Sequence, residues 1–268
     1  MFNTNYNFFD YKYNIEGYTG QHFGSIYQYI YLGISIILLV VLLILLRKSS
    51  KEKVLKIIRI ISIFMIIFYI GKTIWESIYD IQKFGEFNYN LLPFDTCSII
   101  MYAGILSGFG KGKIKDMATY WLATGCIVGG IANMLFLNAL KFYPFFSFGA
   151  FYSMIWHFLM VFIGLLIIVT NYIDMKYTIV LKGYLLHLLI SLIVIPMDFI
   201  FNFDFMLYKD LGGVPFFGGI ASNLTSMNLG FLNPIMMLVL YFVFFNIIYF
   251  IVVGIRKIKN RLLKYFVV

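Results

Sequence analysis

The chain alternates between long runs of apolar residues and short polar connectors that are mostly basic. A helix needs about 20 predominantly apolar residues to cross the hydrocarbon core of a membrane. The clearest run, from Ile26 to Leu46, meets this length and carries no charge. The pattern predicts seven membrane-spanning helices, at about 26–46, 57–79, 91–109, 117–137, 149–170, 178–200 and 232–254.

The composition narrows the class of protein. Of the 268 residues, 62% are hydrophobic and only 12% are charged, and the mean hydropathy is +0.88. Soluble domains carry about 25% charged residues, and a chain of this size could not bury so much apolar surface. This excludes a soluble enzyme and a disordered chain, and two cysteines are too few for a disulfide scaffold. The fold class predicted is all-α, a polytopic membrane helix bundle.

The basic residues predict an orientation. Sixteen of the 21 Lys and Arg residues follow the first, third, fifth and seventh spans, and four lie on the other side. Cytoplasmic loops carry the excess of Lys and Arg, so we expect the N-terminus outside the cell and the C-terminus in the cytoplasm. The membrane we expect is a cell membrane, such as a bacterial plasma membrane. A basic tail binds anionic lipid headgroups. Membrane lipids are therefore the expected partners, and the net charge of +9 needs no nucleic acid.

Three segments organise the chain: an external segment 1–25, the seven-helix domain 26–254 and a basic cytoplasmic tail 255–268. The first segment lacks the basic start of a cleavable signal peptide. The stretch 201–231 is long for a connector and rich in Gly, Ser and Asn. Its length predicts a re-entrant or lid-like external loop.

Ionisable residues inside a span are costly in lipid and are therefore candidates for function. Lys72 and Glu76 lie four residues apart in the second span and share one helix face. They either neutralise each other as an ion pair or form part of a polar site.

The third span begins with a group of polar residues. Pro93 suits a first helical position, which places Asp95 in the first turn, where the helix dipole favours a carboxylate. A helix N-terminus also makes a thiol such as that of Cys97 more reactive, although a buried cysteine is often only a small apolar side chain. On a regular helix the two residues would face different directions, so a direct pairing needs an irregular first turn.

His157 in the fifth span falls at the depth expected for Cys97. A cysteine and a histidine are the minimum parts of an activated thiol nucleophile; the alternative is a histidine that bonds between helices. Asn133 and Asp198 also fall in the outer half of their spans. The sequence thus predicts a polar cavity open to the outer side, lined from five spans by Lys72, Glu76, Asp95, Cys97, Asn133, His157 and Asp198.

Other chemistry is not indicated. His187 and Cys126 fall nearer mid-span and are predicted to be structural. The sequence has no phosphate-binding loop or dinucleotide fingerprint, and its three histidines are too scattered for a zinc site. We therefore expect no metal and no cofactor.

The stretch from Leu91 to Cys97, Leu-Leu-Pro-Phe-Asp-Thr-Cys, resembles the LPLHLC-type motif of the YwaF-like integral membrane proteins. The resemblance continues through the aromatic segment 144–157, through 202–206 and through the loop before the last span. It covers about 88–250 and the seven-span layout.

The resemblance implies a function for two residues. Most bacterial members of the family have no assigned activity, but an animal branch is proposed to be a lipid acyltransferase in which a Cys carries the acyl group and a His activates it. Cys97 matches the motif Cys and His157 the later His. The family motif usually has His where this chain has Asp95, so the role of that residue does not carry over.

Three functional hypotheses follow. In the first, the protein transfers lipid acyl groups with Cys97 as nucleophile, His157 as general base, and Asp95 or Asn133 orienting them. In the second, it is a transporter or polar-solute-binding protein that uses intramembrane charges, namely Lys72, Glu76, Asp95 and Asp198. In the third, it is a membrane scaffold without catalysis. The substrate and the oligomeric state do not follow from the sequence.

Overall fold

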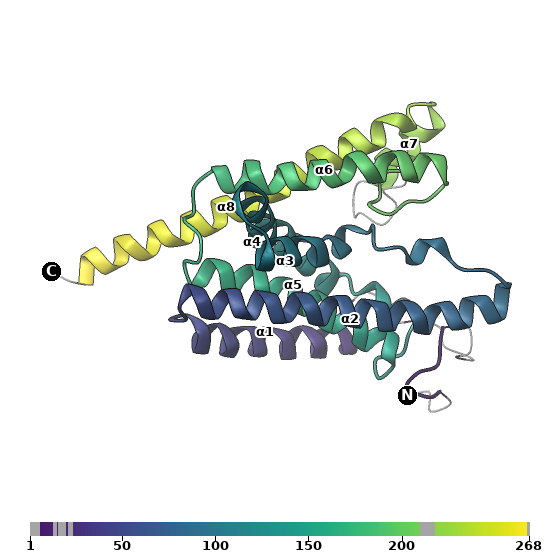
Figure 1. The fold of residues 1–268 in the computed structure, drawn as a ribbon, viewed down its shortest axis with the longest axis horizontal. Coiled ribbons are helices and arrows are strands. Elements are labelled where there is room, and N and C mark those ends of the chain that lie inside the picture. Colours follow the sequence, from purple (N-terminus) through teal and green to yellow (C-terminus); the bar gives the residue numbers. More distant parts are fainter. Residues whose placement is uncertain (1–5, 13–14, 16–19, 21–23, 210–217, 267–268) are drawn as a thin grey trace. The chain divides into compact units, whose positions relative to one another are not determined.

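The structure is a computed structural model that describes residues 6–12, 15, 20, 24–209 and 218–266, and these residues form helices and no strand (Figure 1). Within the described ranges, seven helical segments are long and apolar enough to cross a membrane. The all-helical, seven-span prediction is confirmed. The α-helices are α1 (Ile26–Leu46), α2 (Lys51–Phe84), α3 (Ile99–Phe109), α4 (Gly112–Leu135), α5 (Phe148–Val169), α6 (Thr178–Ile200), α7 (Gly218–Ser226) and α8 (Asn233–Phe266). Short 3-10 helices are η1 (Tyr89–Leu91), η2 (Thr96–Ser98), η3 (Asn138–Lys141) and η4 (Gly230–Leu232).

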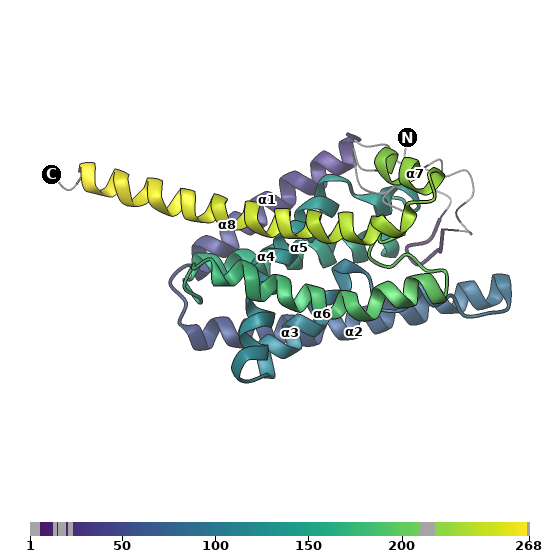
Figure 2. The same ribbon diagram turned by 90° about the horizontal axis from the view of Figure 1, so that it is seen from above.

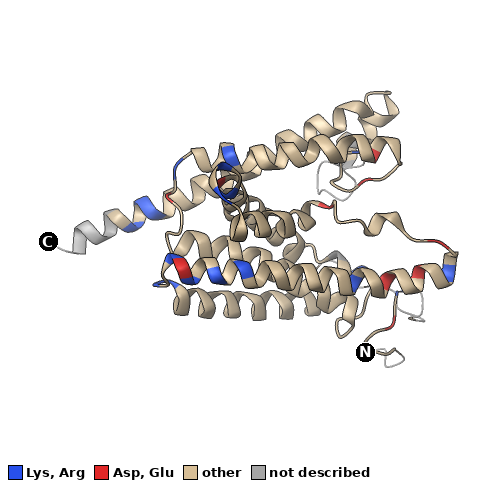
Figure 3. Cartoon of the chain, in the orientation of Figure 1, with Lys and Arg blue, Asp and Glu red and all other residues tan. Residues whose placement is uncertain are grey.

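Helix α2 is longer than the predicted second span. Its 34 residues extend for about 51 Å at about 1.5 Å per residue. The Ser50 side chain caps the start by accepting from the Lys53 N–H, and Gly85 ends the helix at φ 76°, a conformation that favours glycine. Charged residues lie near both ends of α2 with an uncharged stretch between them (Figure 3). The hydropathy pattern marked only the apolar middle of the helix.

The third span differs from the prediction at its start. Pro93 does not begin a regular helix: the chain passes through η1 and η2, and α3 begins only at Ile99. Asp95 is the N-cap of η2, with extended backbone at φ −61° and ψ 150°. The irregular first turn that a pairing of Asp95 with Cys97 would require is therefore present.

Two further segments differ from simple connectors. The long segment 201–231 contains the short helix α7 and η4, while residues 210–217 of the predicted lid-like loop lie outside the described residues. Helix α8 continues to Phe266, so the backbone of most of the predicted tail is helical.

The chain divides into two compact units. The first comprises residues 1–92 and 129–172, and the second comprises 93–128 and 173–268. The chain therefore passes between the units three times, once within α4.

In the first unit, α5 packs against both α1 and α2 (Figure 2). Polar side chains of α1 form hydrogen bonds to α5 and α4. The Tyr31 hydroxyl donates to the Met154 carbonyl at 2.9 Å, and the Gln28 amide donates to the Leu135 carbonyl. Ser147 caps α5 by accepting from the Ala150 N–H. These bonds satisfy polar groups that would otherwise be costly inside a membrane.

In the second unit, α6 packs against α8. The two helices run antiparallel, since Tyr177 contacts Tyr249 while His187 contacts Tyr241. A hydrogen bond of 2.7 Å between the hydroxyls of Ser107 and Thr119 joins α3 to α4.

The exposed faces of the long helices are apolar. On α1 the exposed side chains include Ile30, Ile34, Ile37, Val41 and Leu45, which recur at helical spacing along one face. Large exposed apolar faces are unusual in soluble monomers and suit contact with lipid tails. Together with the seven apolar helices, they identify the chain as an integral, multi-pass membrane protein.

Candidate functional site

The predicted site residues are divided between the two units. Lys72, Glu76, Asn133 and His157 belong to the first unit, and Asp95, Cys97 and Asp198 belong to the second. Each group is described here within its own unit. The pairing of Cys97 with His157 therefore stays a prediction.

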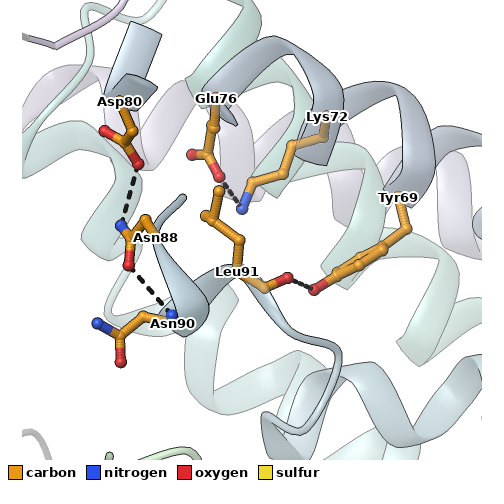
Figure 4. A network of polar contacts seen from close by, with 7 residues as sticks. All are labelled: Tyr69, Lys72, Glu76, Asp80, Asn88, Asn90 and Leu91. Carbon is orange, nitrogen blue, oxygen red and sulfur yellow. Dashed lines mark hydrogen bonds and ion pairs between the residues drawn. The ribbon is translucent and has the colours of Figure 1, made fainter. Parts of the chain in front are cut away.

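Lys72 and Glu76 form an ion pair on α2 (Figure 4). The Lys72 ammonium also lies 5.7 Å from the centre of the Tyr152 ring on α5, a favourable cation–π geometry. The Glu76 carboxylate is buried. The predicted ion pair is present, and the part of these two residues in a polar site stays a prediction.

Asp80 is a second buried carboxylate on α2, and the sequence analysis did not single it out. Its side chain is 1% exposed, and Oδ2 accepts from the Asn88 side-chain amide at 3.0 Å (Figure 4). Asn88 Oδ1 in turn accepts from the Asn90 N–H at 3.1 Å. Among the described residues, Oδ1 of Asp80 has no hydrogen-bond partner. Its position one turn after Glu76 was the signal that could have identified it.

Aromatic side chains surround this end of α2. Tyr11 packs against Trp75, Tyr79 and Tyr143, with ring centres 5.3–6.0 Å apart. Burial raises the pKa of the Tyr143 phenol, and the negative charges of Glu76 and Asp80 raise it further. Tyr143 therefore stays a neutral hydroxyl at physiological pH, next to two carboxylates.

His157 is buried on α5, and its Nδ1 lies 2.7 Å from the Ser153 carbonyl oxygen. A carbonyl oxygen only accepts hydrogen bonds, so the proton must sit on Nδ1 and Nε2 is the basic nitrogen. Helix α4 approaches closely here, because a Cβ on Gly130 would lie 3.0 Å from the His157 carbonyl oxygen. Asn133 follows on α4, where its Oδ1 is buried and has no partner within the described ranges.

Cys97 is half-buried in the middle of η2, and neither it nor Cys126 is in a disulfide. The preceding residue, Thr96, shares a hydrogen bond with the Tyr241 hydroxyl of α8. The Ser98 N–H donates to the Asp95 carbonyl at 2.8 Å and closes the turn. The turn that carries Cys97 is thus fastened to α8, although the Asp95 side chain itself is exposed.

Asp198 has a structural partner in its own unit. The carboxylate is fully buried near the end of α6, and Oδ1 accepts from the Phe205 N–H at 3.0 Å. It therefore holds the segment that follows α6. That contact is structural, and the solute-binding role of Asp198 stays a prediction.

In the first unit, the Lys72–Glu76 ion pair lies near a second buried carboxylate, that of Asp80. In the second unit, the turn that carries Cys97 is bonded to α8 through Thr96 and Tyr241. No group of three or more His, Cys, Asp or Glu side chains in the described ranges could hold a metal ion. Comparisons of the chain with models of protein families, with curated proteins and with solved structures find no match.

Proposed function

We propose that the protein transfers acyl groups between lipids, with Cys97 as acyl carrier and His157 as general base. The sulfur attacks the carbonyl carbon of a lipid ester, the C–O bond breaks, and the thiol proton passes through His157 to the departing alcohol. A second lipid alcohol then attacks the thioester, the C–S bond breaks, and the thiol is restored. Neither step requires a cofactor.

The observation that carries this proposal is the hydrogen bond from His157 to the Ser153 carbonyl. It makes Nε2 the basic nitrogen, which a general base for a thiol requires. The resemblance of Leu91–Cys97 to the YwaF-like motif supports the same pair of residues. Membership of that family is itself part of the proposal.

The fixed position of the Cys97 turn also favours this role. A nucleophile must be held in place for efficient attack, and the Thr96–Tyr241 hydrogen bond holds the neighbouring residue. Asn133 is proposed to stabilise the protonated form of the base, because its buried Oδ1 has no partner in the described part of the chain and can accept from an imidazolium N–H.

Acyl exchange in proteoliposomes tests the proposal. Vesicles that contain two phospholipids with distinguishable acyl chains are incubated with the protein, and the mixed species are counted by mass spectrometry. We expect Cys97→Ala to abolish exchange and His157→Gln to lower it by about 10²–10⁴-fold, the usual contribution of a general base. Cys126→Ala is the matched control and should retain exchange. Full exchange by the Cys97 variant would refute the mechanism.

A second candidate function, binding or transport of a polar solute, is favoured by the buried Asp80 carboxylate beside the Lys72–Glu76 pair. Buried charges in membrane proteins often mark solute pathways. The same vesicles separate the two functions. Loss of solute uptake in Glu76→Gln, with normal uptake in Cys97→Ala, would favour transport over acyl transfer.

A further inference from the structure

His187 lies near the middle of α6 and is enclosed by aromatic rings. Its side chain is 0% exposed, and its ring centre lies 4.1 Å from that of Tyr241. Tyr184 and Phe245 pack at 6.2 and 6.1 Å. All of these contacts lie within the second unit.

Neither nitrogen of this imidazole has a hydrogen-bond partner among the described residues. A neutral imidazole carries one N–H donor and one acceptor nitrogen. Buried polar groups are almost always satisfied, and each exception requires an explanation such as a bound molecule. The two nitrogens point away from each other, so His187 requires one group that donates and a second group that accepts.

A second buried donor borders the same aromatic cluster. The indole Nε1–H of Trp121 on α4 is buried and has no partner within the described residues. A Cβ on Gly125 would lie 2.8 Å from this nitrogen and 3.0 Å from the Phe245 ring. Since Phe245 also packs on His187, the indole and the imidazole both lie near this phenylalanine ring.

The other polar groups of the cluster are hydroxyls that already have hydrogen-bond partners, and the Tyr184 hydroxyl donates to the Leu238 carbonyl at 2.8 Å. Ser191 Oγ donates to the His187 carbonyl at 2.8 Å and so accepts from the Tyr208 hydroxyl, which lies 2.5 Å away. Tyr241 is paired with Thr96. No charged residue occurs on α6 between Lys182 and Asp198. A charged ligand would lack a counter-charge on this helix, which an ion in the membrane interior requires.

We propose that His187 binds the hydroxyl group of an uncharged lipid, such as a diacylglycerol. A hydroxyl can donate to the acceptor nitrogen of the imidazole, and an ester oxygen of the same lipid can accept from its N–H. The rest of such a lipid is apolar, as the aromatic side chains and the membrane require. The Trp121 N–H provides a further donor for an ester oxygen of the same molecule. An ordered water is the competing occupant.

The inference does not depend on acyl transfer. The His187 cluster is linked to the Cys97 turn through Tyr241 and Thr96. On the proposed function, a hydroxyl bound here belongs to the alcohol that accepts the acyl group. Binding is therefore measured in the Cys97→Ala background, so that a failure of the chemistry and a failure of the site give different results.

Photolabelling in lipid nanodiscs tests the site. The probe is a diacylglycerol with a photoreactive group in one acyl chain, and its matched control carries the hydroxyl as a methyl ether. We expect competition by unlabelled diacylglycerol to be about tenfold weaker in His187→Phe, the loss typical of one buried hydrogen bond. Phenylalanine keeps the ring packing, and thermal unfolding checks that the variant folds. Tyr249→Phe, on the same helix as Tyr241 but outside the cluster, should label normally.

Two results would overturn the inference. Equal labelling by the methyl ether would show that the hydroxyl is not recognised, a comparison that needs no variant. Absence of saturable labelling by either probe would assign the imidazole a bound water only.

Discussion

Asp198 makes a structural contact that the sequence analysis did not predict. Its carboxylate is 0% exposed and bonds to the backbone of Phe205, seven residues further along the chain. The sequence pattern identified Asp198 as a residue that would be costly to expose to lipid, and its side chain is indeed buried. The partner could not be predicted, because it lies in a loop without regular periodicity.

At this residue we predict that Asp198→Ala lowers the free energy of unfolding by about 1–3 kcal/mol, because the Phe205 N–H is left buried without an acceptor. Asp198→Asn keeps an acceptor oxygen and should stay close to the parent protein. Thermal unfolding in detergent measures both variants. Equal stability of the alanine variant and the parent would exclude the folding role.

Some of the other site residues could be predicted from the sequence and others could not. The Lys72–Glu76 pair could be predicted because helix geometry alone brings the residues four apart together. The same helix spacing could have added Asp80 to the pair. Asn88 and Tyr143 could not be combined with them from the sequence, since their contacts join the end of a helix to loops.

Among the elements, α4 and α6 approach closely at a glycine. A Cβ added at Gly183 would lie 3.0 Å from the backbone of Tyr120 and 3.1 Å from that of Trp121. Small residues allow transmembrane helices to pack tightly in this way. The contact also places the start of α4 beside the helix that carries His187.

We therefore predict that Gly183→Leu destabilises the second unit by about 1–3 kcal/mol, the usual cost of overpacking. The matched control is Gly254→Leu on α8, because a Cβ at Gly254 has no neighbour within 4 Å. Thermal unfolding in one detergent compares the two variants. If both melt at the same temperature, the close contact between α4 and α6 is not present in the protein.

Element boundaries could be predicted where hydropathy alone decides them. The predicted spans 26–46 and 178–200 match α1 and α6. The start of the third span could not be predicted, because its irregular turn is held by Tyr241, a residue 145 positions away from Thr96. Such tertiary contacts override the local preference of Pro93 for a helix start.

At the scale of the whole molecule, the composition was sufficient to predict that the chain is a membrane protein. Seven apolar helices in the described ranges follow directly from the runs of apolar residues. The distribution of the polar residues over two units does not follow from these runs, since the chain passes between the units within α4 as well as in connectors. The orientation predicted from the basic connectors, with the C-terminus in the cytoplasm, remains a prediction.

The most direct test of the proposed acyl transfer is the mass of the intact protein after incubation with a phospholipid of defined acyl chain. We predict a population heavier by one acyl group, located on Cys97 by peptide mapping and removed by neutral hydroxylamine, which cleaves thioesters. The Cys97→Ala variant should show no such population. An unmodified protein under conditions of acyl exchange, or an adduct that persists in Cys97→Ala, would contradict the account.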